Sequence, residues 1–395
     1  MQKRRYVLIV FILMLTAFFI QYEVFAEDES DKISPELQEE LERLSNELDL
    51  AEWQKYYDEL HESYSVLGEY DGIMDLVVGL ASGSSDIGFS DIGQLLKELF
   101  LPGLKDALTR MIGMVALGVL SGICAMSLGE DRGTKQVLLL IITGTAILLL
   151  TGYFALLAGE AKKCVEKVSS FCSVAAPVML GLLTSLGCAG SARLLSPTMI
   201  VLSNIILSVI GNIIIPLLLA GGILSIINGL TDKMKLSRSI KFINSTVKWV
   251  LGLMTTVYIA VNTIEGLTAG TADRITLRTT RYAIDKLIPA VGGMVSGAVD
   301  AVIGGAVILK NAVGLAAILI IAAIVIRPIM MLIAGMLSLR ISSAIIEPFS
   351  EPGITGILDG NADTISYLFA AVSAAASMFI VNIMVIMSLG NTLVG

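Results

Sequence analysis

The chain has 395 residues, of which 55% are hydrophobic and only 16% are charged, and its formal net charge is −8. A soluble globular domain carries about 25% charged residues, so this composition excludes an ordinary soluble protein and predicts an all-α polytopic membrane protein. The charge is unevenly distributed, because residues 27–106 hold 21 acidic and 5 basic side chains whereas residues 107–395 hold 13 and 19. The acidic part argues against nucleic acid as a partner.

The first 26 residues have the pattern of a cleavable secretory signal peptide. Lys3, Arg4 and Arg5 form a basic start, residues 6–20 are an apolar run, and Ala26 ends a stretch with cleavage-site spacing. An uncleaved signal anchor is the alternative. Both interpretations place residue 27 and the chain after it outside the cytoplasm.

Residues 33–67 are predicted to form an acidic extracytoplasmic helix. Ser34 suits the N-cap and Pro35 the first helical position. Apolar residues recur at helical spacing at Leu37, Leu41, Leu44, Leu48, Trp53, Tyr57, Leu60 and Tyr64. This face packs either on a neighbouring part of the same chain or on a partner. The chain's single histidine, His61, is expected to be a solvated side chain on this helix.

A Gly/Ser-rich link and an amphipathic stretch follow at residues 68–107. Ile92, Leu95, Leu96, Leu99 and Phe100 fall on one side of a helix, which is predicted to lie along the membrane surface. We therefore divide the chain into the signal peptide at 1–26, an extracytoplasmic region at 27–107 and a membrane domain at 108–395.

The membrane domain contains apolar segments of two kinds. Six are expected to cross the bilayer, namely residues 108–128, 137–158, 198–228, 249–264, 312–338 and 365–389. Residues 174–189 and 289–305 are shorter and rich in Gly and Pro. The chain has eight spans if both short segments cross, and six if both are re-entrant. Basic residues in the loops do not decide between the schemes, although a cytoplasmic loop holding Lys233, Lys235 and Arg238 would favour six.

Two pairs of prolines recur at the same separation. Pro177 and Pro289 are 112 residues apart, and so are Pro216 and Pro328. They define two predicted repeat units, at about 174–264 and 286–389, each with a broken apolar segment. Such segments at matching places in two halves of a membrane protein indicate a transport or channel site. Tight helix packing is the alternative explanation for the Gly and Pro residues.

No catalytic constellation is visible, so we expect no enzyme activity, no cofactor and no metal site. The sequence has no HExxH, GxSxG, CxxC or Walker-type loop, and the four cysteines fit buried apolar positions. Arg327, inside a span, is the costliest charge. Asp300 and Lys310 are each expected to mark a loop, and a pair of Asp300 with Lys310 or Arg327 is the alternative. The candidate pore or hinge residues are Pro177, Gly181, Pro216, Pro289, Gly292, Gly293, Asp300, Lys310, Asn311, Arg327 and Pro328.

Residues 286–318 carry a resemblance to a known family. The Pro289–Gly293 run, Asp300, Gly304 and the Lys310–Gly314 run resemble the central segment of the stage III sporulation protein AE family. The resemblance implies a non-enzymatic, permease-like component of the multiprotein channel that links mother cell and forespore during endospore formation. It also implies the mother-cell membrane as location, and membrane lipid and the other channel proteins as partners. A stand-alone secondary transporter and a non-conducting assembly scaffold are the alternatives.

Overall fold

The computed structural model describes residues 50–61, 70–83, 89–127, 132–230, 236–287, 292–348 and 352–389. Within these ranges the chain is helical and contains no strand. The predicted signal peptide, the leucine stripe at 37–48 and Pro289 lie outside the described residues. The helices are α3 (Ala51–His61), α4 (Ile73–Ala81), α5 (Phe89–Ser127), α6 (Arg132–Ser185), α7 (Ala189–Ser196), η2 (Pro197–Leu202), α8 (Ser203–Val209), η3 (Ile210–Ile214), α9 (Ile215–Leu230), α10 (Ser237–Leu287), α11 (Gly292–Ile346) and α12 (Pro352–Ser388).

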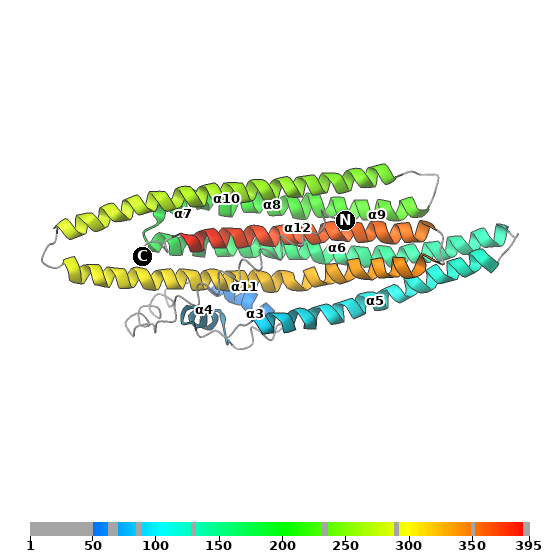
Figure 1. Ribbon diagram of the computed structural model, residues 1–395, viewed down its shortest axis with the longest axis horizontal. Coiled ribbons are helices and arrows are strands. Elements are labelled where there is room, and N and C mark those ends of the chain that lie inside the picture. Colours follow the sequence, from blue (N-terminus) through cyan, green and yellow to red (C-terminus); the bar gives the residue numbers. More distant parts are fainter. Residues whose placement is uncertain are drawn as a thin grey trace.

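Six stretches of the described chain are long and apolar enough to cross a membrane. They are α5, α6, the run from α7 to α9, α10, α11 and α12, which lie side by side and alternate in direction (Figure 1). The small helices α3 and α4 lie against one flank of this bundle. The prediction of an all-α protein with several membrane-spanning helices is therefore confirmed, with six candidate spans.

The two short Gly/Pro segments are not separate elements, and that prediction is wrong. Residues 174–185 are the last turns of the 54-residue helix α6, and residues 292–305 begin the 55-residue helix α11. Pro177 and the charged stretch 160–167 lie inside α6, and the side chains of Pro177, Lys162 and Lys163 are exposed. Exposed polar side chains do not interrupt a helix that is held by packing on its other face. Six spans thus arise without re-entrant segments.

The two predicted repeat units have different local structures. In the first, Leu186–Cys188 reverse the chain between α6 and α7. There Gly187 has φ +80°, its N–H binds the Thr184 carbonyl and the Cys188 N–H binds the Leu183 carbonyl, which is a Schellman ending that favours glycine. The second unit has no such reversal between Gly292 and Ile346. The equal spacing of the prolines therefore does not correspond to matching breaks in the described helices.

Pro216 leaves a milder mark than the predicted interruption. It is the second residue of α9 and directly follows η3, a π-helical turn at Ile210–Ile214. A proline ring collides with the carbonyl four residues earlier, here that of Asn212, and a wider turn relieves the collision. A second π-helical stretch, η2, begins at Pro197. The third span is therefore continuous but locally widened twice.

The structure also differs from prediction before the first span. Residues 73–81, expected to be link, form the short helix α4, in which Ile73, Leu76 and Val77 are buried. The amphipathic stretch at 90–107 does not form a separate surface helix, because α5 continues through Pro102 into the first span. The apolar side of α4 packs against α11, which explains why so short a segment is ordered as a helix.

The long helices exceed the thickness of one bilayer. At 1.5 Å per residue, α6 and α11 are each about 80 Å long, whereas the hydrocarbon core of a bilayer is about 30 Å thick. Tilting accounts for only a small part of this difference, because transmembrane helices rarely tilt beyond about 40°. A large part of the bundle therefore extends beyond a single hydrocarbon layer.

Candidate functional site

The helix α3 docks on the C-terminal half of α6 through aromatic side chains. Trp53 is fully buried, and its ring meets the ring of Phe171 edge-on at 5.2 Å. Tyr56 contacts the same ring at 5.1 Å, and Phe171 in turn contacts Phe379 of α12 at 5.6 Å. The predicted apolar face of this helix is thus confirmed at Trp53, Tyr57 and Leu60, and it packs on the chain's own bundle.

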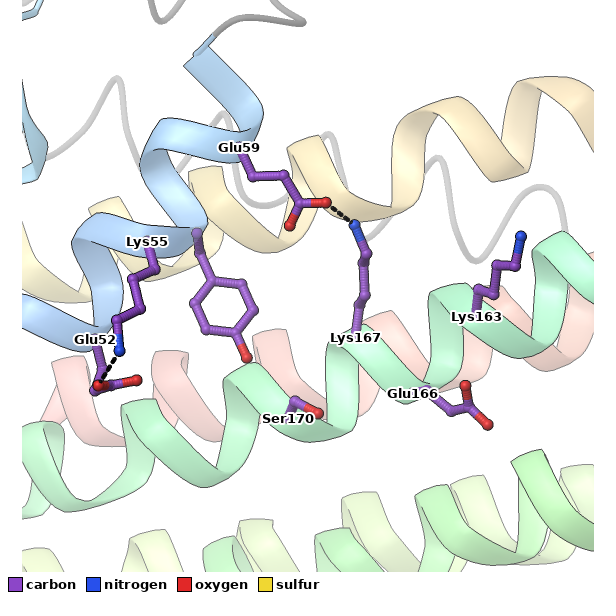
Figure 2. A pocket seen from close by; sticks show the side chains of 8 residues that line it. Glu52, Lys55, Glu59, Lys163, Glu166, Lys167 and Ser170 are labelled. Carbon is purple, nitrogen blue, oxygen red and sulfur yellow. Dashed lines mark hydrogen bonds and ion pairs between the residues drawn. The ribbon is translucent and has the colours of Figure 1, made fainter.

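A charged groove lies beside this contact, between α3 and α6 (Figure 2). The open cavity has a volume of about 470 Å³. Glu59 of α3 forms an ion pair with Lys167 of α6, which is the only charged link drawn between the two helices in Figure 2. The other ion pair in the view joins Glu52 and Lys55 within α3, at 2.5 Å. Both pairs are well exposed, so they contribute little to stability, and of the two only the pair between Glu59 and Lys167 links α3 to α6. The lining residues are Glu52, Lys55, Tyr56, Glu59, Lys163, Glu166, Lys167 and Ser170.

Tyr57 ties α3 to the start of α4. Its hydroxyl donates to the Tyr70 carbonyl at 2.7 Å, and the Ile73 N–H donates to Gln54 Oε1 at 2.9 Å. Burial, with a smaller contribution from the carboxylates of Asp75 and Asp58, raises the pKa of Tyr57 to about 12. The two short helices therefore form one polar-linked unit on the flank of the bundle.

Lys310 is fully buried, and its role differs from the predicted loop marker. It lies inside α11 with Asn311, which is also buried. Its ammonium group donates to the carbonyls of Ile386 at 3.2 Å, Met387 at 3.0 Å and Leu389. These are carbonyls at the end of α12, where a helix leaves acceptors without intrahelical partners and favours positive charge. Lys310 thus caps the carbonyl groups at the C-terminal end of α12.

Arg327 and Asp300 do not form the predicted pair. Both lie in α11, and the 27 residues between them correspond to about 40 Å along the helix axis. The ten residues between Asp300 and Lys310 correspond to about 15 Å, and the Lys310 ammonium is directed at α12 instead. A pair between Asp300 and Arg327 is therefore excluded by distance, while the side chain of Asp300 itself lies outside the described part of the structure.

Arg327 lies on the outside of the bundle, level with the charged stretch of α6. The Cys164 thiol approaches the Ile324 carbonyl at 3.9 Å, which fixes the register of the antiparallel pair α6 and α11. Arg327 is therefore level with Lys162 and Lys163, and all three side chains are exposed. These residues form a charged belt halfway along the bundle. Long basic side chains at such positions lay their aliphatic stems along apolar surface and extend their charged ends to water.

The other predicted pore or hinge residues are dispersed over the bundle. Pro177, Gly181 and Pro216 are exposed, and Pro328 is half-buried next to Arg327. Gly292 and Gly293 begin α11, and Asp300 lies in its third turn. The structure brings together Lys310 and the end of α12 but does not gather the predicted set around one cavity. Cys164, Cys172 and Cys188 are buried, as predicted, and none of the three forms a disulfide within the described residues.

A buried polar cluster at η2 was not predicted. The Ser203 hydroxyl lies 2.7 Å from the Tyr258 hydroxyl and 3.1 Å from the Thr198 carbonyl, to which it donates. Asn382 of α12 donates from Nδ2 to Ser203 Oγ at 3.0 Å. The cluster therefore joins the third, fourth and sixth candidate spans, and Ser203, Tyr258 and Asn382 are each at most 2% exposed.

Asn262 and Glu265 extend the cluster along α10. Asn262 Nδ2 donates to the Tyr258 carbonyl at 3.0 Å, and the Thr198 hydroxyl donates to Glu265 Oε1 at 2.5 Å. Asn262 Oδ1, Asn382 Oδ1 and Glu265 Oε2 are buried and have no hydrogen-bond partner among the described residues. Within the described chain no group of three or more His, Cys, Asp or Glu side chains is arranged to hold a metal ion.

A sequence signal for this cluster existed. Tyr258, Asn262 and Glu265 recur at spacings of four and three, which places them on one face of a helix. The predicted span 249–264 ends one position before Glu265, so it includes Tyr258 and Asn262 but not the carboxylate. Ser203, Thr198 and Asn382 come from distant segments, and only the fold brings them to α10.

Comparison with known proteins identifies the family. Residues 72–390 match the family described as stage III sporulation protein AE. The chain belongs to this family. It is 28% identical over 262 residues to the stage III sporulation protein AE of Bacillus subtilis (strain 168), an alignment that covers 66% of each chain. The match thus spans just under two thirds of that relative's length. No solved structure matches the chain.

The resemblance noted at residues 286–318 is confirmed by this match, since the matched range contains the whole of that segment. The same range includes α4 to α12, so the match covers most of the described helices rather than a single motif. The chain is therefore a sporulation-family protein with six candidate membrane-spanning helices.

Proposed function

We propose that the chain is a membrane component of the multiprotein channel that links mother cell and forespore during endospore formation. The observation that carries this proposal is the family match over residues 72–390, combined with a bundle far longer than one bilayer. A helix bundle that projects about 50 Å beyond the hydrocarbon core of the membrane suits a protein that bridges part of an intermembrane space. Its role is structural and conducting, and we propose no enzymatic step.

The predicted signal peptide supports an orientation for the bundle. α5, α9 and α11 end, and α6, α10 and α12 begin, at one end of the bundle (Figure 1). The sequence near that end contains Lys135, Lys233, Lys235, Arg238 and Lys241, but the sequence near the other end contains Arg274, Arg278, Arg281 and Lys286, so basic residues do not decide the orientation. The predicted signal peptide places the chain after residue 26, and with it α3 and α4, outside the cytoplasm. The exported unit α3–α4 then docks on the opposite, extracytoplasmic half. We propose the mother-cell membrane around the forespore as the location.

We expect partner proteins to bind at the charged groove between α3 and α6, which is open to solvent. The groove between α3 and α6 offers acidic and basic side chains in alternation on the proposed extracytoplasmic half. It suits contact with other proteins of the channel complex in the intermembrane space, while the exposed apolar side chains of α6 and α10 suit lipid. Nucleic acid is not proposed as a partner.

A stand-alone secondary transporter is the second candidate. The buried polar cluster at η2 favours it, because polar side chains joining several spans are typical of solute or ion pathways. This alternative predicts solute uptake by the purified protein alone in liposomes. A non-conducting scaffold predicts instead that changes in the bundle interior act only through folding.

Deletion of the gene in its native organism tests the proposal. A channel component predicts normal vegetative growth and loss of heat-resistant spores, with development arrested after engulfment. Complementation with Arg327→Gln, beside Lys162→Gln as a control at the same level of the belt, then separates the roles. Loss of spores by Arg327→Gln but not by Lys162→Gln, with the complex still assembled, would show that Arg327 has a role beyond assembly. Normal spores in the deletion strain would refute the proposal.

A further inference from the structure

The buried cluster at η2 has more acceptors than the hydrogen bonds within it use. Ser203 donates its single proton to the Thr198 carbonyl, so the 2.7 Å contact between hydroxyls requires Tyr258 to donate to Ser203. Asn382 also donates to Ser203, and Thr198 donates to Glu265. The hydroxyl protons of the cluster are thus assigned, while side-chain oxygens of Asn262, Asn382 and Glu265 stay without a partner among the described residues.

Such a surplus calls for a positively charged or proton-donating ligand. Buried polar atoms in native proteins nearly always have a hydrogen-bond partner, and a buried charge is nearly always compensated. Asn262 and Asn382 are at most 1% exposed. Glu265 forms no ion pair with a basic side chain in the described part of the chain. Its carboxylate therefore has a hydroxyl donor from Thr198 but no positive charge beside it.

We propose that this cluster binds a monovalent metal cation, sodium or potassium. Carboxylate and amide oxygens are the ligands that hard cations prefer. The cluster contains one carboxylate, which balances one positive charge, whereas divalent-cation sites commonly use several. A water molecule would satisfy the amide oxygens but would leave the carboxylate charge uncompensated. Glu265, Asn262 and Asn382 are assigned as ligands, with the Tyr258 hydroxyl beside them.

The π-helical stretch gives the site its shape. Ser203 N–H binds the Thr198 carbonyl, a π-helical spacing of five residues, so Thr198 and Ser203 both face α10. In a regular α-helix, five residues correspond to about 500° of rotation, which is one full turn and about 140° more. The two side chains would then point to different sides of the helix. Single π-helical turns inside α-helices are found frequently at functional sites. This inference does not depend on the proposed channel role.

The experiment uses the purified full-length protein in lipid nanodiscs. Its thermal unfolding is followed by maleimide labelling of the buried cysteines, in increasing sodium or potassium chloride with choline chloride added to constant ionic strength. A site of this kind predicts a saturable rise of the unfolding midpoint with one or both metal cations and none with choline. Absence of a cation-specific rise in the wild-type protein would overturn the proposal.

Three variants locate the effect. Glu265→Gln keeps the shape and an acceptor for Thr198 but removes the charge, and Asn262→Leu removes an amide ligand. Each is expected to raise the half-saturating cation concentration at least about tenfold. Asn361→Leu is the matched control, because Asn361 is equally buried, also donates to a carbonyl four residues earlier, and also has an unpaired Oδ1 among the described residues. Wild-type saturation in Glu265→Gln would contradict the assignment.

Direct binding provides a readout that does not depend on any variant. Radioactive sodium at equilibrium with the wild-type protein is expected to bind at about one ion per chain and to be displaced by unlabelled sodium but not by choline. If potassium is the preferred ion, it displaces sodium at lower concentration than sodium itself. No binding of either ion would refute the site.

Discussion

At the scale of single residues, buried polar groups determine where this bundle is held together. Lys310 crosses from α11 to the end of α12, and Tyr258 connects to the third and sixth spans through Ser203. The residues that matter most lie in helix interiors rather than at the predicted Gly and Pro positions. An apolar helix pair packs in many registers, whereas a single buried cation facing three carbonyls is satisfied in one.

Replacing Lys310 with methionine is expected to loosen the end of α12. The substitution keeps the length of the side chain but removes the charged donor from the carbonyls of Ile386, Met387 and Leu389. Hydrogen bonds to charged groups contribute about 1.5–3 kcal/mol, so amide hydrogen exchange over the last turn of α12 should accelerate about tenfold or more. Lys241→Met, at an exposed position, is the control. Unchanged exchange in Lys310→Met would show that α12 ends without this cap.

Because the pKa of Tyr57 is raised in the fold, we expect α3 to detach from the bundle at alkaline pH. In the unfolded chain its hydroxyl ionises near pH 10, whereas in the fold its pKa is about 12. Between these values the unfolded state loses the proton first, so the stability of the docked helix is complete below about pH 10 and falls as the pH rises toward about 12. Fluorescence of Trp53 in a Trp249→Phe background should report this release, and Tyr57→Phe should abolish its pH dependence. A pH-independent signal in the parent protein would contradict the assignment.

At the scale of elements, close contact between helices depends on a few glycines. A side-chain carbon at Gly222 of α9 would overlap the ring of Phe154 of α6, whereas one at Gly252 of α10 would meet no atom within 4 Å. Both glycines are helical, so alanine gives both the same gain in helix propensity of about 1 kcal/mol.

Gly222→Ala is therefore expected to destabilise the bundle, and Gly252→Ala to stabilise it or leave it unchanged. The overlap forces α9 away from α6 or the Phe154 ring out of its rotamer, at about 1–3 kcal/mol. The thermal unfolding midpoint of the two variants, in the same detergent or nanodisc, measures the difference. Equal midpoints would show that α6 and α9 are not in close contact at this level.

The elements also show how far sequence reasoning reaches here. The apolar spacing in residues 50–61 predicts the buried face of α3 correctly, because helical periodicity is a local signal. The division of 137–158 from 174–189 and of 289–305 from 312–338 was wrong, because Lys162 and Lys163 are exposed on a continuous helix and Lys310 has its partners 76 to 79 residues away. A charged residue within an apolar segment indicates a loop as long as its distant hydrogen-bond partner is not known. The cluster at η2 joins side chains from three spans. Local spacing reveals only its α10 members, because the contacts with the other two spans depend on the fold.

At the scale of the whole molecule, length is the informative property. Six candidate spans with helices of up to 55 residues form a bundle that one bilayer cannot cover. The charged belt at Lys162, Lys163 and Arg327 lies about halfway along it, and α3 and its groove dock next to that belt. These features are consistent with one half in the membrane and the other half extending from it.

The most direct test of this account is the sidedness of three exposed positions in one cysteine-free background. Lys55→Cys reports the side on which α3 lies. Arg193→Cys reports the end of the bundle at α7, and Glu347→Cys reports the opposite end, where α11 ends. All three native side chains are exposed. With the protein expressed in vegetative cells, where the extracytoplasmic side of the cell membrane faces the medium, a membrane-impermeant maleimide is expected to label Lys55→Cys and Arg193→Cys, and to label Glu347→Cys only after permeabilisation. A chain in which residues 174–189 cross the membrane separately would place Arg193 on the side opposite to Lys55. Labelling of Arg193→Cys only after permeabilisation would therefore contradict the six-span bundle.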